Sequence, residues 1–439
     1  MGRACPSILF VAPAAYPLGG LATWLDDLTP GLRERGFDVT VGLVEGDHHD
    51  VDAYLELHPL PRTIRIRSRT GTREGRIRAL VRAFEETAPD LVAAVNIVDV
   101  YPAVQRLRAA GRDLKVAMTL HGLQADLFAD LREFGALVDS VIVTNRLTGE
   151  LCRQLASFPE DRIYYAPYGV PSSAAPSVRC EAGKLRVGFV GRFERDQKRI
   201  QDLPEIVETT LRDDPGVRFL FAGGGPDEAW LRSALESHAA TSGVRFCGAL
   251  PVDEVRNGFL PGTEILLVTS SWETGPIVAW EAMSRGVVLV SSRYVGSGRE
   301  NSLRDGENCL LFEVGDVAGA SRAILRLRDP ELRERLGREG RALVAQRYST
   351  ESSLAAWAES FQTTLQLPVR PLAELRSTRH RAGRLDRLLG ERLGESIRQV
   401  VGSGFDHDDP GGEWPHTANP RALSDVEFFR QIAREDRPC

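Results

Sequence analysis

Short apolar runs alternate along this chain with stretches whose apolar residues recur every three or four positions. The short runs fit buried strands of a parallel sheet, and the periodic stretches fit amphipathic helices that cover it. The helical stretches include residues 73–86, 146–155, 317–327 and 331–344. The strand-like runs form two successive sets: 8–12, 39–44, 91–95, 116–119 and 141–144, then 185–190, 217–222, 244–246, 265–268, 287–290 and 309–312.

Strands that alternate with helices predict an α/β fold with doubly wound parallel sheets. A stretch rich in Pro, Ser and Ala at residues 171–176 interrupts the alternation, so we place a hinge there. We therefore expect two Rossmann-like domains facing each other across a cleft, with a third segment after them. The expected boundaries are 1–178, 179–366 and, for a helical and loop extension, 367–439.

Composition narrows the class of protein. A chain of 439 residues with 42% hydrophobic residues can bury two full cores. The net charge of -6 argues against a general nucleic-acid binder. The 6 cysteines are scattered without a Cys-x-x-Cys pair, which suggests neither zinc nor a disulfide framework. No apolar run approaches the roughly 20 residues that span a bilayer. We expect a cytoplasmic protein and leave open peripheral contact with the inner face of a membrane.

Two carboxylates between two predicted strands mark a candidate ligand site. Glu273 and Glu281 lie between the runs 265–268 and 287–290, and Pro276 suits the first position of the intervening helix. Glu273 then lies in the loop at the carboxyl end of a strand, where open parallel sheets bind ligands. Glu281 lies more than one turn into a helix that is apolar nearly all round, so we expect it to be buried.

A buried Glu281 needs a partner, because an unpaired buried carboxylate is costly. No Lys or Arg precedes it at helical spacing, so we expect a pair of ligand hydroxyls, such as a ribose diol, to serve. A glutamate on an ordinary helix surface is the alternative.

The pattern from Glu273 through Glu281-Ala-Met to Gly286 resembles the signature of the retaining GT-B glycosyltransferases of family 4, also called glycosyl transferases group 1. The resemblance implies that Glu273 contacts the donor sugar and that Glu281 holds the nucleotide ribose. Many members have Gly-Phe after the first Glu, where this chain has Thr274. The donor-binding residues that the resemblance implies in this segment are Glu273, Gly275, Pro276, Ile277 and Glu281.

A basic loop follows the predicted strand 185–190. Its segment from Gly191-Arg192 to Lys198 resembles the Gly-Arg-Leu motif and downstream Lys of the same family. The resemblance implies that Arg192 and Lys198 neutralise the donor diphosphate, whose charge grows as the sugar departs. A solvated basic loop is the alternative.

A glycine pair follows the predicted strand 8–12. Backbone amides at Gly19 and Gly20 can approach a phosphate, because no side chain intervenes and a helix begins there. A plain strand-to-helix turn explains two glycines equally well. The resemblance places Gly19 and Gly20 against the donor diphosphate and the acceptor. Pro30 predicts a break or kink in the helix that follows.

His121 follows the predicted strand 116–119. A lone His is more often structural than catalytic, but the resemblance places this one near the donor sugar, as a candidate for positioning it. We name no side-chain base, because in such retaining enzymes a leaving phosphate oxygen is commonly thought to take the acceptor's proton. The candidate catalytic residues are Arg192, Lys198, Glu273 and His121.

The leading interpretation is a retaining glycosyltransferase that moves a sugar from a nucleoside-diphosphate sugar to an acceptor hydroxyl, with no cofactor and no metal ion. A sugar-nucleotide epimerase or phosphorylase of the same architecture, and a catalytically silent donor-binding subunit, remain alternatives. A dinucleotide-dependent dehydrogenase is set aside, because no Gly-x-Gly-x-x-Gly follows a strand. The expected partners are the nucleotide sugar and an acceptor, either a glycan, a lipid-linked glycan or a small natural product, and no nucleic acid. The sequence identifies neither the base, the sugar and the acceptor nor the oligomeric state.

The predicted extension 367–439, called the tail below, begins with a basic amphipathic segment. Residues 370–400 hold eight Arg and four acidic residues, with leucines at roughly helical intervals. Such a segment can lie on an anionic membrane or pack on its own protein. We expect packing, because the acidic residues compensate the charge. The Asp-rich stretch 406–409 fits a solvated turn better than a metal site, and a closing helix is expected near 425–433.

Overall fold

The computed structural model describes residues 5–15, 17, 19–172, 185–237, 243–373, 383–415 and 419–436. The chain forms two compact units. The first contains Met1–Ala166 and Leu354–Gln431, and the second contains Pro167–Ser353 and Ile432–Cys439. The expected domain boundary at 178 and most of the expected hinge lie outside the described residues. The sequence assigned residues up to 366 to the second domain, whereas Leu354–Gln431 belongs to the first unit.

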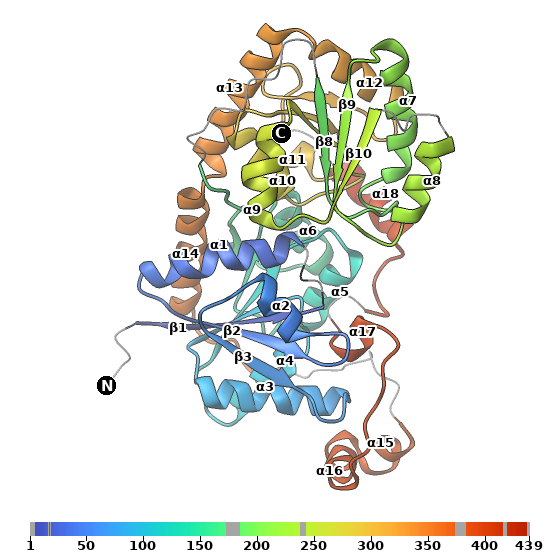
Figure 1. The fold of residues 1–439 in the computed structure, drawn as a ribbon. Coiled ribbons are helices and arrows are strands. Elements are labelled where there is room, and N and C mark those ends of the chain that lie inside the picture. Colours follow the sequence, from blue (N-terminus) through green and yellow to red (C-terminus); the bar gives the residue numbers. More distant parts are fainter. Residues whose placement is uncertain are drawn as a thin grey trace. The chain divides into compact units, whose positions relative to one another are not determined.

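The first unit contains a parallel sheet of seven strands in the order β3-β2-β1-β4-β5-β6-β7 (Figure 1). Phe10 of β1 lies between Val41 of β2 and Ala93 of β4. Two strands were not predicted: β3, at one edge, buries only Ile66, and β7, at the other, has three half-buried residues. The strands are β1 (Ser7–Pro13), β2 (Asp38–Glu45), β3 (Thr63–Arg67), β4 (Leu91–Val95), β5 (Lys115–Leu120), β6 (Ser140–Val143) and β7 (Ile163–Tyr165).

Helices cover both faces of this sheet, with α1 and α3 on opposite sides (Figure 1). The sequence predicted a break or kink at Pro30, but the helix α1 is not broken there and continues to Glu34. Proline removes one backbone hydrogen bond, but the neighbouring Leu28 and Leu32 are buried and hold the helix on the sheet. The helices are α1 (Gly20–Glu34), α2 (Val51–Leu57), α3 (Arg73–Thr87), α4 (Val100–Ala109), α5 (Ala125–Phe134) and α6 (Arg146–Ala156).

The segment Leu354–Gln431 also belongs to the first unit. Trp357 and Phe361 of α14 (Thr350–Gln366) contact the rings of Trp24 and Phe10, with centroids 4.8 and 5.6 Å apart. The following helices are α15 (Arg384–Leu389), α16 (Glu391–Val401), α17 (Pro410–Glu413) and α18 (Asp425–Glu435). On α18, Phe428 packs against Phe128. None of the helices in the described part of the chain is long and apolar enough to cross a membrane.

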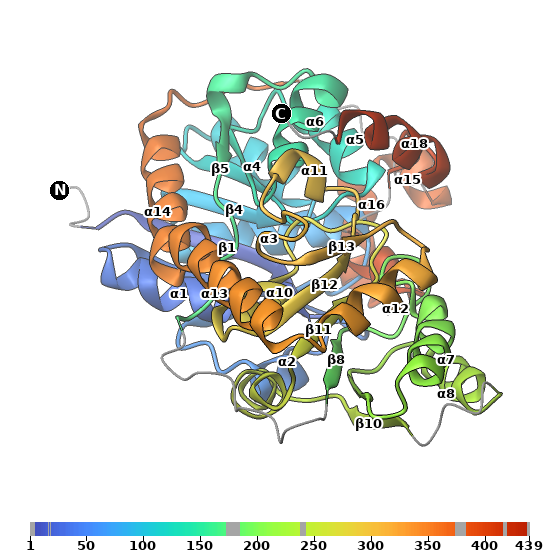
Figure 2. The ribbon, with the colours of Figure 1, turned by 90° about the horizontal axis from the view of Figure 1, so that it is seen from above.

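The second unit contains a parallel sheet of six strands in the order β10-β9-β8-β11-β12-β13. Along β11, Ile265 and Leu267 join the core under α7, α8 and α12, while Leu266 and Val268 join the core under α10 and α13. The two groups of helices lie on opposite faces of the sheet (Figures 1 and 2). The strands are β8 (Arg186–Val190), β9 (Arg218–Ala222), β10 (Val244–Gly248), β11 (Ile265–Val268), β12 (Val288–Ser292) and β13 (Leu310–Phe312). The helices are α7 (Leu203–Asp213), α8 (Glu228–Ser237), α9 (Val252–Glu254), α10 (Ile277–Ser284), α11 (Ser297–Glu300), α12 (Val317–Arg326) and α13 (Pro330–Arg347).

Candidate functional site

Two neighbouring strands of the second sheet carry the candidate site at their carboxyl ends. From β8 the chain moves outward to β9, and from β11 it moves in the opposite direction to β12. Loops that leave in opposite directions open a crevice between them, and open parallel sheets bind ligands there. The loops after β8 and β11 are also tied together, because Thr269 Oγ1 donates to the carbonyl of Lys198 at 2.6 Å. The site is therefore built on rigid strand ends.

Lys198 and Glu273 meet in this crevice, 75 residues apart in the chain. Lys198 Nζ lies 2.6 Å from Glu273 Oε1, and Ser270 Oγ donates to the same oxygen at 2.7 Å. Gln197 Nε2 donates to the other carboxylate oxygen at 3.2 Å. The Glu273 side chain is only 8% exposed, so these three donors offset the cost of burying its charge. The motifs singled out after β8 and β11 thus belong to one cluster.

Arg192 follows β8 and extends into solvent. Its side chain is 53% exposed, and its one ion pair among the described residues is with Glu194 at 3.3 Å. An ion pair as exposed as this one contributes little to stability. The backbone around Arg192 is fixed, because Phe193 N donates to the carbonyl of Gly224 at 2.9 Å. The Arg192 side chain therefore extends into solvent from a backbone that is held in place.

A glycine loop after β9 allows the backbone around Arg192 to adopt this position. Gly223 has φ +140°, and a Cβ there would lie 1.9 Å from the carbonyl oxygen of Gly191. Gly225 has φ +158°, and its Cβ would lie 2.6 Å from the Phe193 carbonyl oxygen. Both positions require glycine for conformation and for space. This glycine run was not among the predicted site residues, yet it supports the Arg192 loop.

Glu281 is buried in α10, as expected, but its partner differs from the expectation. Arg256 Nε lies 2.5 Å from Glu281 Oε1, and both side chains are nearly buried. Arg256 comes from the turn Val255–Phe259, 25 residues earlier, so helical spacing could not detect it. Arg285 completes the group by donating to the backbone carbonyls of Arg256 and Glu281. Glu281 therefore has a protein cation as its partner.

The loop between Glu273 and α10 depends on Gly275. This residue has φ +141°, and a Cβ there would lie 3.0 Å from the ring of Tyr168. Pro276 is the N-cap of α10, one residue before the helical position expected for it, and Ile277 begins the helix. The indole N–H of Trp280 is buried near Gly275 without a hydrogen-bond acceptor among the described residues.

A further anion-binding element, which sequence reasoning missed, lies in the loop after β12. Backbone hydrogen bonds of 3.0 and 2.9 Å join Val295 to Glu273 and Ser271, so this loop adjoins the Glu273 loop. Here the amides of residues 296, 298 and 299 donate to the Asp436 carboxylate at 2.6, 3.2 and 2.7 Å. Converging backbone N–H groups form an anion-binding nest. The glycines of the loop were a weak signal, and nothing local in the sequence identified Asp436.

In the first unit, the glycine pair lies at the start of α1. Gly19 is the N-cap, with extended backbone at φ -170°, and Gly20 begins the helix. Tyr16 and Leu18, which precede the glycine pair, lie outside the described residues. The loop is held by His58, whose Nε2 donates to the carbonyl of Pro17 at 2.7 Å and whose Nδ1 lies 2.5 Å from Asp26. Burial favours neutral His58, but the bonds to Asp26 and Pro17 outweigh it and raise the pKa.

His121 follows β5 and packs against Trp24, with Trp357 farther away. Its ring centroid lies 4.3 Å from that of Trp24 and 6.1 Å from that of Trp357, and its Nε2 bonds Thr119 Oγ1 at 2.9 Å. The residue keeps some exposed surface, but burial of the ring lowers its pKa to about 3. A neutral imidazole fits a positioning role better than that of a cationic acid.

Asn96 is another residue of this sheet edge that sequence reasoning missed. It follows β4, which neighbours β1 at the point where the first sheet changes direction. Its φ of +57° is unusual for a residue with a side chain. Its buried Oδ1 has no hydrogen-bond donor among the described residues. Gly19, Gly20 and His121 thus lie at the carboxyl ends of strands in the first sheet. The other predicted residues lie at the carboxyl ends of strands in the second sheet, or in the helix that follows one of them.

Two family models match the chain. The one described as "Glycosyltransferase Family 4" matches residues 18–173, and the one described as "Glycosyl transferases group 1" matches residues 184–329. Together the matches cover more than half of the chain.

Curated relatives match parts of the chain. The lipopolysaccharide core biosynthesis glycosyltransferase LpsE of Rhizobium meliloti (strain 1021) is 31% identical over 171 residues, which are 39% of this chain and 47% of LpsE. The N-acetyl-alpha-D-glucosaminyl L-malate synthase of Bacillus anthracis is 24% identical over 282 residues, 58% of this chain and 70% of that synthase. The chain spans about half the length of the first of these relatives.

Solved structures share the fold. Sucrose-phosphate synthase from Thermosynechococcus elongatus superposes with a TM-score of 0.67 at 20% identity, over 82% of this chain and 98% of that one. HepE from Anabaena, in complex with UDP and glucose, gives 0.66 at 16% identity, over 82% and 100%. The architecture is therefore GT-B, with two Rossmann-like parallel-sheet domains.

Gly223→Ala combines a strained φ with a clash against the Gly191 carbonyl. It is expected to lower the free energy of unfolding by about 2 kcal/mol, the order of cost of one strained backbone position. Urea unfolding followed by tryptophan fluorescence measures the change. The matched control is Gly224→Ala, whose Cβ would meet only the flexible end of Glu228 at 3.5 Å and should leave stability nearly unchanged. Equal stability of the two variants would contradict the steric argument.

The contribution of His58 to stability should depend on pH. Its folded pKa is raised above the unfolded value of about 6.5, so the stabilisation is fully present below that pH and is lost as pH rises through the folded pKa. The loss in free energy of unfolding caused by His58→Gln should therefore be larger at acidic than at alkaline pH. Denaturant titrations on both sides of neutrality test this, and a loss independent of pH would refute the charged pairing with Asp26.

Proposed function

The chain belongs to the family 4 glycosyltransferases, or glycosyl transferases group 1, and from this membership we propose that it moves a sugar from a nucleoside-diphosphate sugar to an acceptor hydroxyl. One observation in the second unit carries the proposal. Lys198, Glu273, exposed Arg192 and the amides of residues 296–299 lie at the carboxyl ends of neighbouring strands. Cations, amides and a carboxylate together suit a ligand that has both phosphate and sugar hydroxyl groups.

Lys198 and Glu273 exchange partners when the donor binds in this proposal. Lys198 turns from the carboxylate to the diphosphate, and Glu273 then accepts hydrogen bonds from the hydroxyls of the sugar. Ser270 and Gln197 remain to orient the carboxylate, at 2.7 and 3.2 Å. The neutral pair thus holds both groups in place until the donor supplies a partner for each.

The proposed chemical step is a substitution at the anomeric carbon. The acceptor oxygen forms a bond to this carbon, the bond from the carbon to the phosphate oxygen breaks, and its electron pair leaves with the diphosphate. The acceptor's proton passes to a leaving phosphate oxygen on the same face, which retains the anomeric configuration. Arg192 and Lys198 stabilise the charge that grows on the diphosphate. We propose that no metal ion takes part, since these side chains supply the positive charge.

Glu281 is proposed to hold the ribose of the nucleotide, with Arg256 as a positioning residue. The pair with Arg256 offsets the cost of burying the carboxylate, and a carboxylate is a strong acceptor for a hydroxyl pair. HepE from Anabaena, one of the solved structures of this fold, is described in complex with UDP, and this supports a nucleoside diphosphate as the leaving group here.

Diphosphate binding should depend on Arg192. Calorimetric titration with UDP, GDP, ADP and dTDP should find at least one ligand whose affinity Arg192→Ala lowers about ten-fold, the effect of losing one charge-assisted hydrogen bond. The matched control is Arg212→Ala, which removes an exposed cation of α7 that pairs with Glu208. Unchanged binding by Arg192→Ala would show that the site is misplaced.

Lys198→Ala needs a second variant, because it also leaves the Glu273 carboxylate without its cation. In Lys198→Ala/Glu273→Gln the buried charge is gone, so a binding defect that persists there belongs to the lost contact between Lys198 and phosphate.

Asp436→Asn should raise the affinity for the diphosphate, whereas Arg192→Ala should lower it. The Asp436 carboxylate occupies three amides beside the Glu273 loop, so it competes with any phosphate that uses them. Removal of its charge should raise the affinity for the same nucleoside diphosphate several-fold, because a neutral amide is a weaker acceptor. Asp425→Asn, at the exposed start of α18, is the control. A fall in affinity with Asp436→Asn would mean that Asp436 supports the loop and does not compete.

A further inference from the structure

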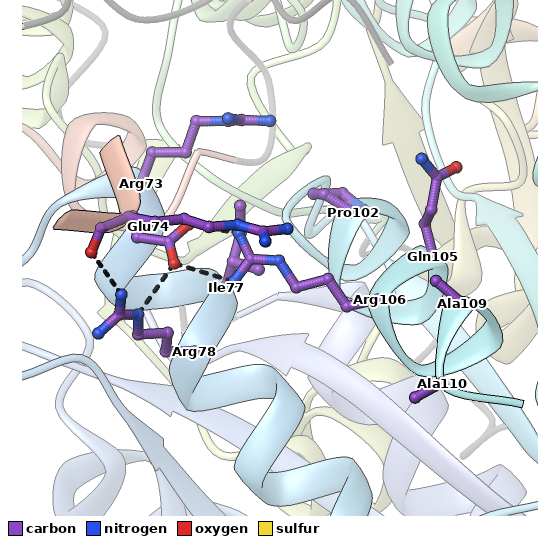
Figure 3. A pocket seen from close by; sticks show the side chains of 10 residues that line it. Arg73, Glu74, Ile77, Arg78, Pro102, Gln105, Arg106, Ala109 and Ala110 are labelled. Carbon is purple, nitrogen blue, oxygen red and sulfur yellow. Dashed lines mark hydrogen bonds and ion pairs between the residues drawn. The ribbon is translucent and has the colours of Figure 1, made fainter. Parts of the chain in front are cut away.

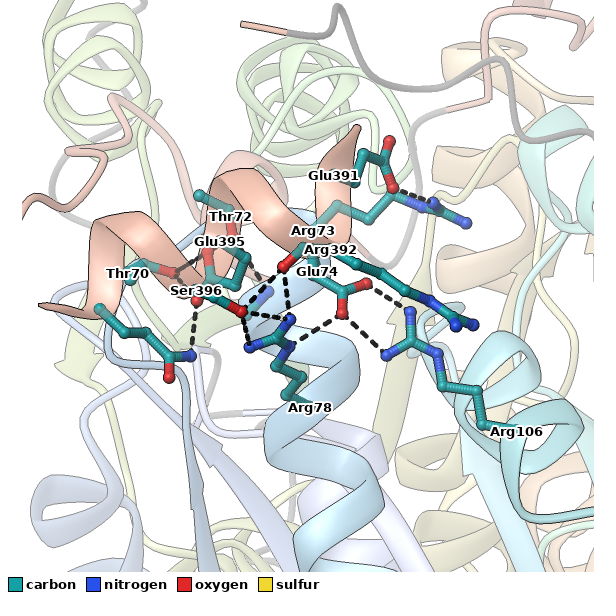
Figure 4. A network of polar contacts seen from close by, with 12 residues as sticks. Thr70, Thr72, Arg73, Glu74, Arg78, Arg106, Glu391, Arg392, Glu395 and Ser396 are labelled. Carbon is teal, nitrogen blue, oxygen red and sulfur yellow. Dashed lines mark hydrogen bonds and ion pairs between the residues drawn. The ribbon is translucent and has the colours of Figure 1, made fainter. Parts of the chain in front are cut away.

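The helix α16 packs on the first unit through polar side chains. Glu395 is completely buried, and its carboxylate accepts hydrogen bonds from the hydroxyls of Thr70 and Thr72 at 2.8 and 2.5 Å. Arg73 pairs with Glu391 at 2.9 Å (Figure 4). Most helices on a protein surface bury an apolar stripe and expose their polar side. In α16 the contact with the protein is made by the polar side.

The helix α15 is attached to α16 in the same way. Arg398 of α16 forms two hydrogen bonds with Asp386 of α15, at 2.6 and 2.8 Å. From α3, Arg78 donates to the carbonyl of Arg392 and to Ser396 Oγ (Figure 4). All three acidic side chains of the two helices are therefore occupied by contacts within the protein.

Most apolar residues of the two helices are exposed, while Leu385 and Ile397 are half-buried. Leu393, Val400 and Val401 of α16 are 53%, 88% and 72% exposed, and their spacing places them with Ile397 along one stripe. On α15, Leu388 is 81% exposed and Leu389 44%. We call these six residues the apolar stripe. Exposed large apolar residues grouped on neighbouring helices mark a surface that another body covers.

Most of the exposed charge beside the apolar stripe is positive; Glu391, with a side chain 41% exposed, is paired with Arg73. Arg384, Arg387 and Arg392 are exposed, and the next exposed acidic residue, Asp406, comes only after α16 has ended. Arg392 also lines an open hollow of about 700 Å³ with Arg73, Arg78 and Arg106 (Figure 3). Arg78 and Arg106 both pair with the carboxylate of Glu74 and Arg73 pairs with Glu391, so two acidic groups balance four cations there. The hollow contains none of the candidate site residues and gives this face a local excess of positive charge.

We propose that the first unit docks onto an anionic lipid surface through the apolar stripe, with Arg384, Arg387 and Arg392 at the headgroup phosphates. An amphipathic helix in a membrane interface buries its apolar side among the acyl chains and places cations at the phosphates. The polar contacts of Glu395, Glu391 and Asp386 hold the helices on the protein while the apolar stripe enters the lipid. The proposal is independent of the glycosyl-transfer reaction, since it involves no residue of the candidate site.

Sedimentation of the full chain with lipid vesicles tests the proposal. The protein should bind vesicles of phosphatidylcholine with phosphatidylglycerol, bind poorly to phosphatidylcholine alone, and dissociate as salt screens the charges. Val400→Asp should lower the partition coefficient about ten-fold, because it removes an apolar side chain that the lipid would bury. Arg392→Gln should lower it about five-fold, the contribution of one cation near an anionic surface.

Matched controls come from residues outside this surface. Val426→Asp changes another exposed valine, on α18, and Arg338→Gln changes another exposed arginine, on α13. Both should bind vesicles like the unchanged protein, and all four variants should keep its melting temperature because the sites are exposed. Failure to bind anionic vesicles at low salt, or equal binding by Val400→Asp, would overturn the proposal. Self-association without vesicles that Val400→Asp abolishes would instead assign the apolar stripe to a second copy of the chain.

Discussion

Glu273 exposes only 8% of its side chain, and a carboxylate at that depth is stable in ionised form only with partners. Its cation, Lys198, is distant in the sequence and reaches it because β8 and β11 are neighbours in the sheet. Their pairing places the loops after them side by side, and the bond from Thr269 to the Lys198 carbonyl joins them. Beside them, the glycine loop after β9 fixes the backbone of Arg192. The need to pair one buried charge therefore accounts for much of the local architecture of the second unit.

The same requirement explains why the cluster suits exchange of partners. Lys198 can leave Glu273 only if another anion takes its place, and Glu273 tolerates the change only if hydroxyl or amide donors replace the ammonium group. A ligand with phosphate alone satisfies the lysine and leaves the carboxylate under-bonded, and a free sugar does the reverse. A molecule that joins a diphosphate to a sugar satisfies both. For the proposed function, this balance favours a nucleotide sugar over either half alone without a group dedicated to rejecting either half.

The sequence predicted the central strands well because these strands are buried on both faces and appear as continuous apolar runs. It missed β3 and β7, which lie at the edges, are short and are only partly buried, so no such run marks them. The partner of Glu281 was missed for a related reason: helical spacing detects neighbours within an element, and Arg256 lies in another element.

The contacts of Asp436 and α14 are even harder to predict from local sequence patterns. Asp436 reaches an amide 140 residues away, and Trp357 returns to the first sheet after the chain has formed the whole second sheet. Such contacts follow from the tertiary path of the chain, which periodicity does not encode. Motif positions at strand ends could be predicted, because the ends of parallel strands share one edge of a sheet whatever the path between them.

The tail shows how the same acidic residues can support opposite conclusions. In the sequence, Asp386, Glu391 and Glu395 compensate the neighbouring arginines and favour packing of the segment on its own protein. In the structure the segment does pack, but these three side chains make the contacts, so their charges no longer balance the arginines that remain exposed. A helix attached by its polar side gains little from the hydrophobic effect within the unit, because its leucines and valines stay in water. That unused apolar area, surrounded by unbalanced cations, is available to stabilise an encounter with a surface that is apolar within and anionic at its border.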